Sequence, residues 1–199
     1  DPLTLLAVLV PGSRTEYLYA ALIVIRIYLS GMAFIMFCRY HKNQGNGVLL
    51  GAVTYCFSGF VLFCGARHPY FINPMIYLPL ILIGIDKIFN REKPWIFVGM
   101  TAISAISNFY FFYMIAIVMV IYAVFRYLMI YGRIRIKELV PWLLKFAGWS
   151  FLGIGIAMPI LLPSAMYVLG TGRMSAKNYI PVLYPLAHYA RLMNDFFGV

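Results

Sequence analysis

The pattern of hydrophobic residues along the chain predicts several helices that cross a lipid bilayer. Residues 95–131 contain a single charged side chain, Arg126, and residues 17–38 also contain only one, Arg26. A helix of about 20 apolar residues crosses the hydrocarbon core of a bilayer, which is about 30 Å thick. Because lipid offers no hydrogen-bond partners, the backbone of such a segment must pair within itself, as it does in a helix. We therefore expect an all-α fold, a polytopic transmembrane helical bundle.

The same pattern divides the chain into about six membrane segments, some of them short or re-entrant. The expected segments are residues 18–37, 48–65, 71–86, 95–107, 109–130 and 139–163. In domain terms, residues 1–17 form an extracytoplasmic loop segment and residues 18–163 form the transmembrane helical domain. Residues 164–199 form an extracytoplasmic loop, whose apolar and polar residues predict short amphipathic pieces lying on the membrane.

Basic residues gather in three short loops between the hydrophobic segments, at residues 39–46, 86–94 and 131–138. Membrane proteins carry an excess of Lys and Arg in their cytoplasmic loops, so we place all three loops in the cytoplasm. The second and third loops share a side only if the chain crosses the membrane an even number of times between them. Residues 95–131 are therefore expected to form two short segments that turn near Asn108, and not one long helix.

Composition excludes a soluble globular protein. The chain is 63% hydrophobic and 11% charged, whereas an ordinary globular domain carries about 25% charged residues. Its net charge of +10 could suggest a nucleic-acid partner, but the cations lie in loops between hydrophobic segments, so we expect no nucleic acid. The three cysteines show no CxxC or Cys/His spacing, so no metal site is expected. The lipid bilayer is the expected surrounding, and a multi-pass protein of the bacterial plasma membrane is the expected class.

One loop on the side opposite the basic loops groups residue types that bind phosphates and sugars. Arg67, His68, Tyr70 and Asn73 lie within seven positions of one another. Arginine offers a fork of donors suited to phosphate, and histidine donates or accepts near neutral pH. Tyrosine and asparagine can bind hydroxyl groups. The alternative is that the loop only anchors the chain at the level of the lipid headgroups.

Two further arginines are candidates for substrate binding. Arg26 lies near the middle of its segment, where a charge costs at least about 2.5–3.5 kcal/mol, so it should face a partner or a water-filled cavity. Arg173 follows the last segment and could meet a lipid phosphate. The alternatives are a structural ion pair for Arg26 and ordinary headgroup contact for Arg173. Carboxylates are scarce on this side, and none of them stands in a pattern that demands catalysis: Asp1, Glu16 and Asp195.

Three stretches, in their order and spacing, make the chain resemble a known family. Residues 67–80 read RHPYFINPMIYLPL, residues 107–114 read SNFYFFYM, and residues 161–164 read LLPS. These resemble the signature of the YfhO family of bacterial membrane proteins. The opening Asp1-Pro2-Leu3 resembles the end of that family's first outside loop, so the chain looks like a piece that lacks the family's first span and first outside loop.

The resemblance implies a fold and an activity. The family is similar to the C-type glycosyltransferases, which take a sugar from a polyprenyl-phosphate donor outside the cytoplasm. The acceptor would be a cell-envelope glycan of the teichoic-acid type. The resemblance also implies that the catalytic acid lies upstream of Asp1, so that these residues alone should be inactive. No cofactor follows with certainty, and a divalent cation is left open.

Two other function classes fit the same sequence. A transporter or flippase for lipid-linked glycans is one, because Arg26 at mid-membrane and short segments at 71–86 and 95–107 are features that transporters place around central sites. A non-catalytic membrane scaffold is the other. A scaffold would tolerate substitutions between Arg67 and Asn73, whereas an enzyme or a transporter would not.

Overall fold

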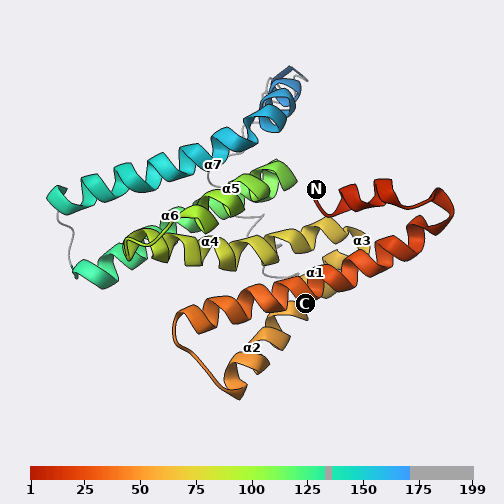
Figure 1. Ribbon diagram of the computed structural model, residues 1–199, viewed down its shortest axis with the longest axis horizontal. Helices are drawn as coiled ribbons and strands as arrows, with labels where there is room; N and C mark the ends of the chain where they lie inside the picture. The colour runs from red at the N-terminus through yellow and green to blue at the C-terminus, as the bar shows by residue number, and fades with distance from the viewer. Residues whose placement is uncertain (133–135, 171–199) are drawn as a thin grey trace, which may run out of the picture. The chain divides into compact units, whose positions relative to one another are not determined.

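The computed structural model describes residues 1–132 and 136–170, and these form helices and connecting turns (Figure 1). The chain divides into two compact units, Asp1–Leu162 and Pro163–Val199, and the first unit contains the features described below. Its helices, with the last continuing into the second unit, are the 3₁₀ turns η1 (Thr4–Leu9), η2 (Gly12–Arg14) and η3 (Pro69–Ile72) and the α-helices α1 (Thr15–Tyr40), α2 (Asn46–Cys56), α3 (Gly59–Arg67), α4 (Asn73–Phe89), α5 (Trp95–Ser107), α6 (Phe109–Tyr131) and α7 (Ile136–Gly170).

The helices confirm the predicted all-α membrane bundle. Among the described residues, five helical segments are long and apolar enough to cross a membrane, and α5 is a shorter apolar helix. Together they are the six segments that the hydrophobic pattern predicts. Residues 164–170 continue α7, and the rest of the predicted loop 164–199 lies outside the described residues.

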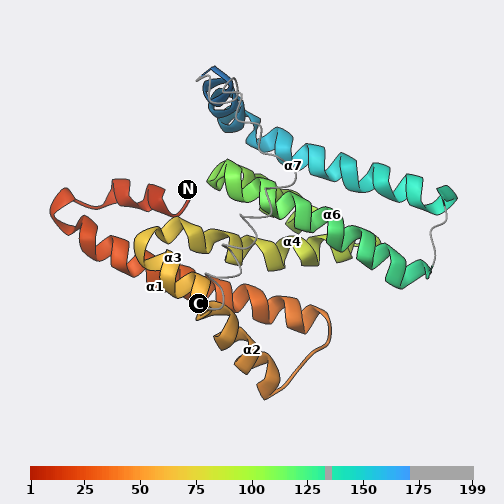
Figure 2. The ribbon, with the colours of Figure 1, turned by 180° about the vertical axis from the view of Figure 1, so that it is seen from behind.

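Helix α4 is the centre of the first unit. It packs against α1 on one side and against α5 and α6 on the other, and both views show it between them (Figures 1 and 2). Its side chains Ile81 and Ile85 are fully buried and form the core with Phe97 of α5 and Met119 of α6. The segment that contains α4 is 61% buried, whereas the other four candidate spans are 11–28% buried, so neighbouring helices cover α4 more than any other of these spans.

A glycine sets the spacing between α4 and α5. A Cβ atom added at Gly84 would lie 2.6 Å from the Cα of Phe97, closer than any real contact. Small residues of this kind let membrane helices approach closely, and packing then replaces the hydrophobic driving force that lipid does not supply. The two backbones therefore touch at this position.

The chain reverses direction at Asn108, as the loop charges predict. Asn108 is extended, and its Oδ1 accepts hydrogen bonds from the backbone N–H groups of Tyr110 at 2.9 Å and Phe111 at 3.3 Å. An asparagine in this position caps the first turn of the next helix. Ser107, at the end of α5, accepts a hydrogen bond from Asn73 in the first turn of α4. Arg126, near the end of α6, pairs with Asp86 in the last turn of α4. Helices α5 and α6 are therefore two antiparallel segments and not one long helix.

The predicted single segment at residues 48–65 differs from the structure, because it is broken into α2 and α3. The break lies at Phe57 and Ser58, where the helix stops and restarts at Gly59. Serine and glycine in sequence are a common cause of sharp helix kinks. The two pieces together still provide a stretch of 20 residues that can cross the membrane.

Replacing Gly84 by alanine should destabilise the bundle by about 1–3 kcal/mol, because the added methyl group must push α4 and α5 apart. Gly99→Ala is the matched control, since a Cβ at Gly99 meets nothing within 4 Å. That change should be neutral or stabilising by up to about 1 kcal/mol, the helix-propensity gain of alanine over glycine. The measurement is the temperature at which the full-length protein in detergent loses its monodisperse elution peak. Equal shifts for the two variants would contradict the close contact.

Candidate functional site

A cluster of polar side chains lies where α1 crosses the start of α4. Arg26, which is 1% exposed, places its Nη2 atom 2.7 Å from Asp1 Oδ2. The Nε atom of Arg26 donates to Asn73 Oδ1 at 2.9 Å, and Nη2 also donates to Thr4 Oγ1 at 3.1 Å. We call Asp1, Thr4, Arg26, Asn73 and Ser107 the arginine cluster.

Local structure explains how these residues meet. Asp1 Oδ1 accepts a hydrogen bond from the backbone N–H of Leu3 at 3.1 Å, and Oδ2 accepts one from Thr4 Oγ1 at 2.7 Å. Bonds of this kind from aspartate to nearby residues favour turns over helix, and here they fold residues 1–4 into a turn just before η1. Because η1 packs on α1, the carboxylate of Asp1 lies against Arg26.

The carboxylate of Asp1 is fully occupied. Its Oδ1 also accepts from Asn73 Nδ2 at 2.9 Å, so each oxygen receives two hydrogen bonds, and its side chain is only 12% exposed. The carboxylate orients Arg26 and balances its charge, and because its oxygens are occupied it is poorly placed to take a proton from a substrate.

The guanidinium group of Arg26 is not fully occupied. Its Nη1 atom is buried and has no hydrogen-bond partner among the described residues. A guanidinium carries five N–H donors, and a buried donor without a partner costs about 1–3 kcal/mol. The Nη1 atom is therefore a position where a ligand oxygen would be stabilised.

The cluster continues toward α5. Asn73 Nδ2 donates to Ser107 Oγ at 3.1 Å, and the Tyr77 hydroxyl lies 3.4 Å from the same oxygen. Tyr70 and Asn108 line this crevice as well. The crevice has no room for a water molecule, so a substrate group could enter only if these side chains moved.

The structure brings together some of the predicted site residues. Arg26 and Asn73 are bonded to each other, and Tyr70 lines the same crevice. Arg67 and His68 are exposed at the end of α3, where the Arg67 guanidinium lies 5.2 Å from the centre of the Phe63 ring. Arg173 lies outside the described residues. Their roles in binding stay predictions.

Asp1, Thr4 and Ser107 were not predicted as site residues. A signal for Asp1 was present, since a buried arginine needs a counter-charge and only three carboxylates are expected on that side of the membrane. Hydroxyl groups such as Thr4 and Ser107 carry no comparable signal, because serine and threonine are common on the surfaces of membrane helices. Among residues 1–132 and 136–170, no cluster of three or more His, Cys, Asp or Glu side chains could hold a metal ion.

A second buried ion pair lies at the opposite end of α4. Asp86 is 0% exposed; its Oδ1 atom lies 2.7 Å from Arg126 Nε, and its Oδ2 atom lies 3.0 Å from His41 Nε2. The Tyr122 hydroxyl donates to Oδ2 at 2.7 Å. These contacts tie the end of α1 and the end of α6 to α4. The three predicted basic loops follow the ends of α1, α4 and α6, which meet here at the last turn of α4. The arginine cluster lies at the first turn of α4.

The pairing of Arg26 with Asp1 is testable in the full-length protein. Arg26→Met leaves a buried carboxylate without its cation, which should cost about 3–5 kcal/mol of stability. Asp1→Asn in the same background removes the orphaned charge, so the double variant should lose much less than the sum of the single losses. Arg14→Met, which removes an exposed cation from the same end, is the control and should have little effect. Thermal denaturation in detergent is measured for the wild type, Arg26→Met, Asp1→Asn alone, the double variant and Arg14→Met, and strict additivity of the two single losses would show that the pair is not coupled.

Comparison with known proteins finds one matching family and one curated relative. The family model described as bacterial membrane protein YfhO matches residues 1–199. A curated relative, the uncharacterized protein YfhO of Bacillus subtilis (strain 168), is 31% identical over 176 residues, which cover 86% of this chain and 18% of that protein. The chain thus spans less than a fifth of the length of this relative. No solved structure matches the chain.

Proposed function

Because the chain belongs to the YfhO family of bacterial membrane proteins, we propose that the whole protein is a glycosyltransferase of the multi-pass type. It would take a sugar from a polyprenyl-phosphate donor and transfer it to a cell-envelope glycan of the teichoic-acid type. The reaction would take place on the extracytoplasmic face, where nucleotide sugars are absent and a lipid-linked donor is needed. The resemblance of the family to C-type glycosyltransferases supports this class of reaction.

The Nη1 atom of Arg26, which has no hydrogen-bond partner within residues 1–132 and 136–170, is the observation that carries the proposal. A buried cation that keeps free donors is suited to an anion with several oxygens, and a phosphate is the anion that a polyprenyl carrier supplies. Hydrogen bonds from arginine to phosphate are charge-assisted and about twice as strong as neutral ones. Asp1 and Asn73 fix the other side of the guanidinium, so Arg26 is held ready and loses little entropy when it binds.

The reaction assigns a role to each part of the site. The acceptor hydroxyl attacks the anomeric carbon, the bond from that carbon to the phosphate oxygen breaks, and the polyprenyl phosphate leaves with the electron pair. Arg26 stabilises the charge that develops on the leaving phosphate. Arg67, His68 and Tyr70 would contact the sugar or the phosphate from the outside loop.

The proton of the acceptor hydroxyl must pass to a base elsewhere in the whole protein. Asp1 is a poor candidate, because both of its oxygens are saturated with hydrogen bonds. A general base must reach the hydroxyl and accept its proton. Since these residues span only 18% of the curated relative, a carboxylate from the remaining part would supply this function.

Transport of a lipid-linked glycan is the second candidate function. The break between α2 and α3 at Phe57 and Ser58 favours it, since discontinuous membrane helices often build the central sites of transporters. An assay of the purified full-length protein in detergent separates the two functions. Sugar transfer can be measured without two compartments, whereas transport cannot.

Substitutions in the full-length protein test whether Arg26, Arg67 and His68 take part in sugar transfer. Arg26→Lys keeps the charge but loses the planar fork, and we expect sugar transfer to fall about tenfold or more, because a hydrogen bond to a charged group is worth about 1.5–3 kcal/mol. Arg67→Ala and His68→Ala should each lower transfer as well. Sugar transfer in detergent and glycan modification in cells are the measurements.

Arg14→Ala is the matched control, because Arg14 is an exposed cation at the same end of the bundle. It should leave transfer unchanged. Wild-type transfer in the Arg67 and His68 variants would remove those two residues from the site. Wild-type transfer in Arg26→Lys would contradict the assignment of the phosphate to Arg26, and unchanged glycan in every variant would favour a scaffold.

A further inference from the structure

A groove runs between α1 and α2 from the end of the bundle that carries the basic loops. It consists of two cavities, of about 520 Å³ and about 320 Å³, which share Ile35 and Leu49 in their walls. The first lies at the turn between the helices, and the second continues along them toward their middle. The groove is open on the surface of the first unit, since Tyr28, Met32 and Leu49 in its walls are 40–65% exposed.

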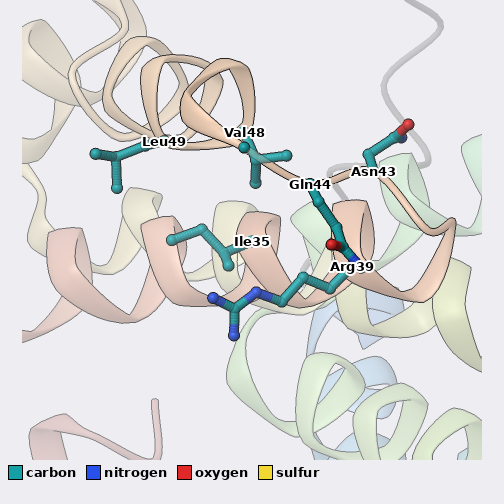
Figure 3. A pocket seen from close by; sticks show the side chains of 7 residues that line it. Ile35, Arg39, Asn43, Gln44, Val48 and Leu49 are labelled. Carbon is teal, nitrogen blue, oxygen red and sulfur yellow. The ribbon is translucent and has the colours of Figure 1, made fainter.

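The outer part of the groove is polar. Arg39, Asn43, Gln44 and Gly45 line it together with apolar residues of both helices. Figure 3 shows the stem of Arg39 lying along α1 below Ile35, with Gln44 reaching over its base from the turn. No carboxylate lines this cavity, and Arg39 makes no ion pair in the part of the chain that the structure describes. Arg39 is therefore an exposed cation to which the described residues offer no counter-charge.

Nearby groups reinforce the positive field at this end. Lys42 lies in the same turn, and the first turn of α2 follows Gly45 without a side-chain cap, so its free N–H groups add a partial positive charge. Two acidic groups of this end are already paired, Glu92 with Lys87 at 2.7 Å and Asp86 with Arg126 at 2.7 Å. The hydrogen bond from Lys87 lowers the pKa of Glu92, so that pair stays charged.

The inner part of the groove is apolar. Tyr28, Gly31 and Met32 line it from α1, and Ala52 and Cys56 line it from α2. Gly31 and Ala52 are buried, and a Cβ atom at Gly31 would lie 3.5 Å from Cys56 Sγ, so the two helices pack closely along the floor of the groove. The lining runs along α1 from Arg39 to Val24, about 22 Å at 1.5 Å per residue. That length accommodates an acyl chain that fills half of a hydrocarbon core about 30 Å thick.

We propose that this groove is a binding site for an anionic phospholipid from the leaflet that faces the basic loops. The lipid phosphate lies at Arg39 and Gln44, and one acyl chain lies between α1 and α2 as far as Tyr28. The polar end matches the charge of the headgroup, and the apolar part matches the length and chemistry of the chain. This site lies at the opposite end of α1 and α4 from the arginine cluster, and it does not depend on the proposed function.

The test uses the full-length protein in vesicles of phosphatidylcholine that contain a small fraction of phosphatidylglycerol with a photoactivatable acyl chain. After irradiation, mass spectrometry of peptides locates the adducts. We expect adducts to concentrate on the peptides that contain Met32 and Leu49. Adducts spread evenly over the outward faces of the other helices, such as α6, would show ordinary surrounding lipid and overturn the proposal.

Two pairs of variants test the two parts of the groove. Arg39→Gln should lower the adducts at least fivefold, and Arg39→Lys should retain most of them, because it keeps the charge. Leu49→Trp should fill the junction of the two cavities and lower the adducts to a similar degree. Leu50→Trp is its control, since Leu50 is 70% exposed and lines neither cavity. Unchanged adducts in Arg39→Gln or in Leu49→Trp would overturn the proposal, provided that the variant elutes as a monodisperse peak.

Competition separates the sources of the phosphate group. Excess unlabelled phosphatidylglycerol should displace the labelled lipid, whereas excess phosphatidylcholine and millimolar inorganic phosphate should not. Equal displacement by phosphatidylcholine would show that the groove holds hydrocarbon without regard to charge. Displacement by inorganic phosphate would show a site for free phosphate. Either of these last two results would overturn the assignment to an anionic lipid.

Discussion

The bundle depends on the pairing of charges that lipid cannot solvate. Arg26 and Asp86 are almost completely buried, and each is paired at 2.7 Å with an opposite charge, Asp1 in one case and Arg126 in the other. A charge left alone at such a depth is costly, and removal of one partner leaves the other uncompensated. These two pairs lie at the two ends of α4 and fix how α1 and α6 are placed around it.

This arrangement separates two kinds of chemistry along one helix. At the end with the arginine cluster, a cation is held by a saturated carboxylate, and one of its nitrogens has no hydrogen-bond partner among the described residues. At the end with the basic loops, Asp86 uses its oxygens for Arg126, His41 and Tyr122, and Arg39 makes no ion pair within residues 1–132 and 136–170. The proposed function places a phosphorylated donor at the first end, and the proposed lipid site places a headgroup at the second.

Much of the fold could be predicted from the sequence, because the decisive signals are local. Hydrophobicity locates the six segments, and the charges of the loops predict the reversal at Asn108 that the structure contains. Pairings between distant residues are different, since Arg26 and Asp86 could each have met several partners. The sequence indicated that Arg26 needs a partner but not that Asp1 provides it, and the break at Ser58 was missed because its surroundings are uniformly apolar. Arg67 and His68 illustrate the same limit, because the sequence places them near Tyr70 and Asn73 but does not reveal that both are exposed at the end of α3.

The most direct test is a structure of the full-length protein with polyprenyl phosphate bound. The account predicts that a phosphate oxygen lies within about 3 Å of Arg26 Nη1, the usual distance of such a hydrogen bond, while Asp1 and Asn73 keep their contacts with the same side chain. A phosphate bound at another place, with Nη1 paired to a protein group from the rest of the chain, would contradict it.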